Sequence, residues 1–224
     1  MALIKLTEES YLILRSLLTL LSAFTAGLLL IAVSELGDKT FFIAVLLAMR
    51  HSRRLIFASV LAALAAMTVL SVAVGQAVSL FPQVYIHYAE IVLFIGFGFK
   101  LLYQASVMPA ASCDAEVVLE ATEVVEKAEF KLPEEQTATA ICLEAFSLTF
   151  LAEWGDRTQF ATIALAAGNN PIGVTTGAIL GHAICTAIAV IGGRMIAGRI
   201  SERTLTGVGG FLFLVFGILA WLQG

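Results

Sequence analysis

The chain has 224 residues, of which 59% are hydrophobic and only 13% are charged, and its mean hydropathy is +0.95. Soluble domains are nearer about 25% charged, so this composition excludes a soluble globular protein and indicates a polytopic membrane protein. The net charge of −4 comes mostly from one acidic segment, and the three cysteines are scattered, without a C-x-x-C pair or a disulfide framework.

Six apolar runs are long enough to cross a bilayer, which takes about 20 residues. An apolar stretch at 10–21 contains Arg15, and three interpretations of it stay open: an extension of the first helix, an interfacial segment or a seventh, partial span. The predicted fold class is all-α, a polytopic membrane protein with six transmembrane helices. These helices are predicted near residues 22–49, 54–80, 84–106, 138–167, 172–198 and 204–223.

One hexapeptide occurs twice. Glu35-Leu36-Gly37-Asp38-Lys39-Thr40 returns 118 residues later as Glu153-Trp154-Gly155-Asp156-Arg157-Thr158, and Gly75 matches Gly193 at the same offset. Each half carries three predicted spans, so the second half must enter the membrane with opposite polarity. The sequence therefore predicts two inverted three-helix repeats. The first repeat is 1–106, the second is 138–224, and an acidic linker at 107–137 joins them.

Basic residues set the expected orientation. Nine of them lie on one predicted side of the membrane and two on the other. Because Lys and Arg accumulate on the cytoplasmic side, the loops 50–54, 107–137 and 199–203 are predicted to be cytoplasmic and both termini non-cytoplasmic. The linker carries eight acidic residues against two lysines. We expect either a solvated connection with a short helix around 116–127, or an element that concentrates cations at the cytoplasmic mouth.

The two hexapeptides place four carboxylates at membrane depth, where each charge costs at least about 2.5–3.5 kcal/mol. If the backbone is helical, the two carboxylates of each motif share one face. Hard oxygen ligands suit Ca²⁺, Mg²⁺ and Mn²⁺, so the sequence predicts a divalent cation site where the motifs meet. The acidic ligands would be Glu35, Asp38, Glu153 and Asp156, and neutral oxygens are available from Ser34, Thr40, Thr158 and Gln159.

Like charges clustered in an apolar environment also favour protonation when no cation is bound. Competition between protons and a cation at one site is the minimal requirement of an antiporter. The other interpretation is structural, because Lys39 follows Glu35 by four residues and Arg157 follows Glu153 by four. Such intrahelical ion pairs would neutralise one carboxylate in each half. The basic residues could instead occupy the empty site or act in gating. Gly37 and Gly155 would permit close approach or a local break in the helix.

Other polar residues within the spans give weaker signals. His182 has Leu64 as its counterpart in the repeat, and it is a proton relay, a ligand or a partner in an interhelical hydrogen bond. Glu90, His87 and Glu144 are predicted near non-cytoplasmic span ends, as interfacial residues or as an exit pathway. The spacing of Gly177 and Gly181 predicts close helix packing. The chain has no catalytic motif, so we predict no enzyme, no cofactor and no nucleic-acid partner.

The twin E-x-G-D-[KR]-[ST] signature resembles that of the manganese/calcium cation–proton exchangers of bacterial, thylakoid and Golgi membranes. The segments Gly177–His182, Gly192–Arg194 and Ile200-Ser201 are similar to the second half of that family, especially its cyanobacterial and plastid branch. The resemblance covers roughly residues 24–223. It implies a six-span inverted repeat that exports Mn²⁺ or Ca²⁺ from the cytoplasm in exchange for protons.

The resemblance also carries over site residues. The four motif carboxylates match its cation ligands, Thr40 and Thr158 match its hydroxyls, and Gln159 matches a glutamine that Phe41 replaces in the first copy. We expect a bacterial inner membrane or a thylakoid-like membrane, with divalent metal ions, protons and lipid as partners and a homo-oligomer as an open question. Two rival functions stay open, an exporter of small amino acids with a related architecture and a membrane assembly factor that transports nothing.

Overall fold

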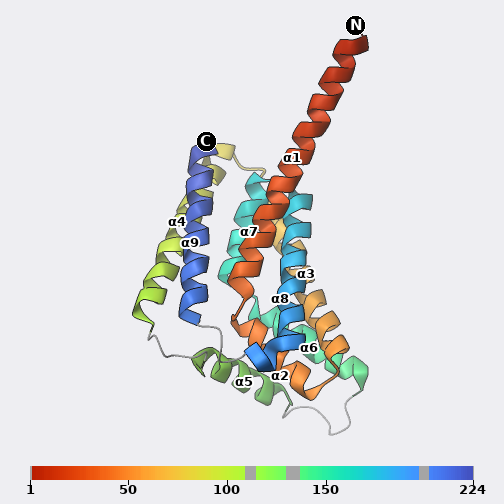
Figure 1. Cartoon of the computed structure of the whole chain (residues 1–224), viewed down its shortest axis with the longest axis vertical. Helices are drawn as coiled ribbons and strands as arrows, with labels where there is room; N and C mark the ends of the chain where they lie inside the picture. The colour runs from red at the N-terminus through yellow and green to blue at the C-terminus, as the bar shows by residue number, and fades with distance from the viewer. Residues whose placement is uncertain (1, 109–114, 130–136, 197–201, 224) are drawn as a thin grey trace.

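A computed structural model describes residues 2–108, 115–129, 137–196 and 202–223, and within these residues the chain forms nine α-helices and no strand (Figure 1). In chain order they are α1 (Ala2–Glu35), α2 (Lys39–Arg50), α3 (Arg53–Val78), α4 (Gln83–Val107), α5 (Ala115–Glu129), α6 (Ala138–Ala152), α7 (Arg157–Gly168), α8 (Pro171–Ile196) and α9 (Glu202–Gln223). Cys113 lies outside the described residues, as do 109–114 and 130–136 of the predicted acidic linker and 199–201 of the predicted loop 199–203.

Five of the described helices contain a stretch long and apolar enough to cross a membrane: α1 from Ser10, α3, α4, α8 and α9. Helix α6 is apolar but has only 15 residues. The predicted spans at 54–80, 84–106, 172–198 and 204–223 correspond to α3, α4, α8 and α9.

The prediction of one helix over 22–49 was wrong. Helix α1 runs without interruption through the stretch 10–21 and ends at Glu35, so that stretch extends the first helix. The predicted span 138–167 is likewise divided between α6 and α7. Each break lies in a short charged hexapeptide between long apolar runs, so hydropathy averaged over the length of a span does not resolve it.

Helix α8 packs closely along α1 through a line of glycines (Figure 1). A Cβ atom at Gly173 would lie 2.5 Å from the carbonyl oxygen of Leu20, and one at Gly177 would overlap the backbone of Phe24. The next glycine, Gly181, faces Ile31. The close packing predicted from Gly177 and Gly181 is confirmed, and such contacts are a main source of attraction between helices in lipid.

Helices α4 and α9 form a second closely packed pair. Phe94 and Phe97 of α4 make aromatic contacts with Phe213 of α9, with ring centroids 5.8 and 5.9 Å apart. Phe94 also contacts Phe216 at 5.8 Å. These four phenylalanines, here called the aromatic cluster, occupy the middle of the two helices.

Helix α5 confirms the short helix expected near 116–127. It lies at the end of the bundle opposite the start of α1 and the end of α9 (Figure 1). Ala121 and Val125 are fully buried in a core cluster that includes Phe41 and Leu47 of α2. The described part of the linker is therefore packed against the bundle rather than fully solvated. Glu144 of α6 lies near Arg50, at the loop 50–54 that is predicted to be cytoplasmic, and not near a non-cytoplasmic end as predicted.

Candidate metal centre

Both hexapeptides interrupt a helix with the same backbone geometry. Gly37 and Gly155 have φ values of 78° and 81°, in the left-handed region that glycine adopts without strain. In each motif the aspartate amide donates to the glutamate carbonyl three residues earlier, over 3.2 Å in both copies. The glutamate thus ends one helix and the aspartate precedes the next. The expected sharing of one helical face does not occur, and the break that the glycines permit replaces it.

The breaks bring three carboxylates from the two motifs together. Oxygen atoms of Glu35, Glu153 and Asp156 all lie within 4.8 Å of one another. This spread is about twice the 2.3–2.6 Å ligand distance of Ca²⁺, so one divalent cation could contact all three. Glu35 and Glu153 are only 3% exposed, and Oε1 of each has no hydrogen-bond partner within the described chain. Buried carboxylate oxygens without partners are costly unless a proton or a cation occupies the site.

The threonine hydroxyls of the motifs point into this carboxylate group. Thr40 Oγ1 donates to Glu35 Oε2 over 3.2 Å, and Thr158 Oγ1 lies 3.4 Å from Glu153 Oε2 and 3.0 Å from Asp156 Oδ2. Gln159 has different partners. Its Oε1 accepts from the Gly155 amide at 2.8 Å, and its Nε2 lies 3.1 Å from Met67 Sδ. In this arrangement the glutamine amide supports the motif turn.

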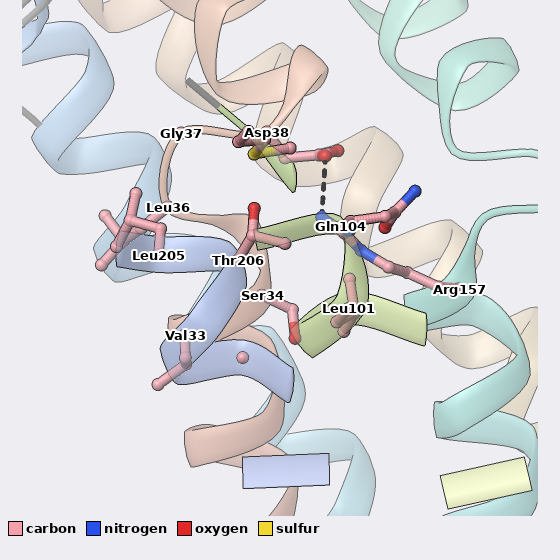
Figure 2. A pocket seen from close by; sticks show the side chains of 12 residues that line it. Val33, Ser34, Leu36, Gly37, Asp38, Leu101, Gln104, Arg157, Leu205 and Thr206 are labelled. Carbon is pink, nitrogen blue, oxygen red and sulfur yellow. Dashed lines mark hydrogen bonds and ion pairs between the residues drawn. The ribbon is translucent and has the colours of Figure 1, made fainter. Parts of the chain in front are cut away.

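The basic residues of the motifs do not form the intrahelical ion pairs considered above. Arg157 crosses to the other motif and donates to Asp38 Oδ1 over 3.1 Å (Figure 2). Lys39 donates to Glu120 of α5 over 3.0 Å. Asp38 is thus held by a guanidinium group beside the three-carboxylate group, while Lys39 fastens the linker helix to α2.

Asp38 and Arg157 line a cavity of about 140 Å³ between α1, α4 and α9 (Figure 2). Ser34 and Gln104 contribute polar groups to its wall, and the Ser34 hydroxyl has no partner among the described residues. Gln104 was not predicted, because a single amide near the end of an apolar helix carries no pattern.

His182 lies between the two motifs. It is 5% exposed and lines two small cavities, one with Glu153 and Thr158 and the other with Glu35 and Thr40. Its Nδ1 atom has no hydrogen-bond partner within the described chain. The first of these cavities is also lined by Met67, Ser71 and Thr162, which were not predicted as site residues. The spacing of Thr158 and Thr162, one helical turn apart on α7, was the available signal.

The sequence matches the family described as the divalent cation/proton antiporter GDT1 over residues 23–109 and 141–224. A GDT1-like protein of Synechocystis sp. is 55% identical over 202 residues, which cover 90% of this chain and 98% of the relative. GDT1-like protein 4 of Oryza sativa subsp. indica is 44% identical over 91% of this chain and 74% of its own length. GDT1-like protein 5 of Arabidopsis thaliana is 42% identical over 91% and 97%.

No solved structure matches the chain significantly. The family match covers most of the sequence, and five helices in the described part have the length and composition of membrane spans. The chain is thus a multi-pass integral membrane protein of a transporter family. The sequence-based recognition is confirmed: the protein belongs to the GDT1 family of divalent cation/proton antiporters.

Proposed function

We propose that the protein exports Mn²⁺ from the cytoplasm in exchange for protons and that Ca²⁺ competes for the same site. The observation that carries this proposal is the meeting of Glu35, Glu153 and Asp156 within 4.8 Å at the two helix breaks. Oxygen ligands of this kind suit both ions, and the family supplies the coupling to protons. A pocket for amino acids would instead need neutral and apolar groups at this position.

In the proposed site, Glu35, Glu153 and Asp156 bind the cation directly, and the hydroxyls of Thr40 and Thr158 complete part of its shell. Asp38 joins as a fourth carboxylate when Arg157 releases it, so the Arg157–Asp38 pair acts as a gate at the 140 Å³ cavity. Lys39 and Gln159 support the motif turns through Glu120 and the Gly155 amide. His182, between the motifs, relays protons.

Protons and the cation compete for the same oxygen atoms. When the cation leaves, the carboxylates would be left as unneutralised charges in an apolar environment, so they take up protons. When a cation binds, those protons are displaced. Exchange follows if only the loaded forms pass between the two access states.

We also propose that the chain crosses the membrane six times as two inverted repeats, 1–106 and 138–224. The identical turn geometry at Gly37 and Gly155 supports this arrangement. The helix packing supports it as well. In the two repeats α1 corresponds to α6, α2 to α7 and α3 to α8. Helices α1 and α2 both contact α8, and their counterparts α6 and α7 both contact α3. In the proposed orientation α5 is cytoplasmic, and the termini, which lie at the opposite end in Figure 1, are not.

Transport by purified protein in liposomes tests the proposal. We expect an imposed pH gradient to drive Mn²⁺ uptake, and Ca²⁺ to reduce that uptake in competition. The double variant Glu35→Gln/Glu153→Gln should abolish uptake, since it removes charge from both buried glutamates but keeps their size. If well-folded wild-type protein moves neither ion, the proposal is wrong, and the amino-acid exporter and the assembly factor become the alternatives to test.

A further inference from the structure

A second cavity lies at the other end of the bundle, away from the three-carboxylate group. Its volume is about 740 Å³, and α1, α4, α7 and α9 line it. Most of the wall is apolar, but α4 contributes a row of polar side chains on one face, at Gln83, His87 and Glu90. The row starts at the first residue of α4, at the end of the bundle where α1 begins and α9 ends (Figure 1).

Exposure falls along this row into the bundle. Gln83 is exposed, His87 is partly buried, and Glu90 is only 9% exposed. No group in the described chain forms a hydrogen bond or an ion pair with the Glu90 carboxylate. A buried acid without a partner in a membrane-spanning helix is costly and is typical of functional positions.

Helix α7 leaves room for this carboxylate. A Cβ atom at Gly168 would lie 2.9 Å from Glu90 Oε2, so any larger residue there would press on the acid. The same helix begins with the second motif, where Thr158 contacts Glu153. Ten residues of α-helix separate Thr158 from Gly168, which places Glu90 about 15 Å from the metal centre along α7.

None of the described residues that line this cavity belongs to the three-carboxylate group. Phe94, Leu165 and Phe216 form part of its wall, and two of these belong to the aromatic cluster. The cavity beside Asp38 begins beyond that cluster, at Leu101 of α4 and Gly209 of α9. The two cavities thus share no lining residue: Asp38 and Arg157 lie in the wall of one, and Glu90 lies in the wall of the other.

We propose that Glu90 is a proton-binding site that takes up protons from the side of the termini during exchange. A single carboxylate provides too few oxygens for a divalent cation, which needs about six or more, but it is sufficient for a proton. Glu90 binds one proton from that solution and gives it up toward the metal centre when the aromatic cluster opens. His87 is the one other titratable group in the lining, since α1, α7 and α9 contribute none. This inference rests on the proposed function.

The test uses everted bacterial membrane vesicles, whose interior corresponds to the side of the termini in the proposed orientation. Mn²⁺ uptake is measured while preloaded buffers set the interior pH. We expect Glu90→Gln to need a roughly tenfold higher interior proton concentration for half-maximal uptake. The apparent affinity for Mn²⁺ outside the vesicles should change by less than about twofold. Glu90→Asp, which keeps a carboxyl group, should restore most of the wild-type pH dependence.

Glu144→Gln is the matched control, because it removes a carboxyl of equal exposure that lies outside the cavity. It should leave the pH dependence unchanged. An unchanged pH dependence in Glu90→Gln would overturn the inference, and so would a loss of Mn²⁺ affinity with normal pH dependence, which would identify a cation ligand instead. Absence of uptake by the wild-type protein would contradict the proposed function itself, whatever the variants do.

Discussion

Replacement of Gly155 by alanine tests whether the left-handed turn holds the metal centre in place. Gly155 has φ of 81°, and a Cβ atom there would meet no described atom within 4 Å. The whole penalty is therefore backbone strain, about 1–2 kcal/mol for a non-glycine residue in this conformation. For a chain of this size we expect the melting temperature to fall by about 2–8 °C.

The corresponding change at Gly37 should cost slightly more. Its φ is 78°, and a Cβ atom there would also lie 2.8 Å from Cδ1 of Leu205, the flexible tip of a side chain that can move away. Gly155→Asn should recover part of the loss, because asparagine adopts the left-handed region more readily than alanine does. Because the turn positions Glu153 and Asp156, Mn²⁺ uptake should fall together with stability.

Thermal unfolding in detergent, followed by circular dichroism, is the assay. The matched control is Gly96→Ala on α4, where a Cβ atom also meets nothing within 4 Å and no unusual φ occurs. There alanine should leave stability unchanged or raise it by about 0.5–1 kcal/mol. The control is expected to melt at or above the melting temperature of the wild-type protein. If Gly155→Ala does the same, the strained turn is not part of the folded protein.

Three further predictions concern other contacts of the site and of the bundle. Asp156→Asn should abolish Mn²⁺ uptake in liposomes without loss of expression, because Asp156 belongs to the three-carboxylate group. Asp38→Asn should do the same, because it removes the negative charge that faces Arg157. Normal uptake by either variant would contradict the proposed site. Glu120→Gln combined with Glu123→Gln should change the apparent Mn²⁺ affinity only modestly, because the Lys39–Glu120 pair is exposed and such pairs contribute about 0–1 kcal/mol; complete loss of uptake would show that α5 acts in transport. Gly177→Leu should prevent recovery of monodisperse protein in size-exclusion chromatography, because the Phe24 backbone leaves no room for a side chain, and a normal elution profile would contradict the close packing of α1 and α8.

Most of the helices could be predicted from the sequence because membrane spans are long apolar runs between polar or proline-containing turns. The same signal failed at the two motifs. Each motif confines its charged residues to a short stretch between long apolar runs, so hydropathy averaged over the length of a span does not resolve the turns at Gly37 and Gly155. Glycine is common in membrane helices, and the sequence around a glycine does not show whether its φ is positive.

The members of the candidate site were predictable from duplication, but their partners were not. Two copies of a motif with two carboxylates each predicted a four-carboxylate group, and the structure brings Glu35, Glu153 and Asp156 together while Arg157 holds Asp38. Which basic residue reaches which acid depends on the packing of separate helices. Spacing along the chain offered only the intrahelical partners as an alternative, because it describes only neighbours within one helix.

The basic residues of the two motifs have different kinds of partner, and the linker is the physical source of this difference. Both turns share one backbone geometry, and Lys39 and Arg157 occupy equivalent positions. A strict twofold arrangement would send Lys39 to Asp156 as Arg157 goes to Asp38. Instead Lys39 pairs with Glu120 of α5, a helix that packs against α2 and occurs once in the chain, between the halves. Because the duplicated helices have only one linker to share, only one of the two motifs keeps its basic side chain available to the opposite carboxylate.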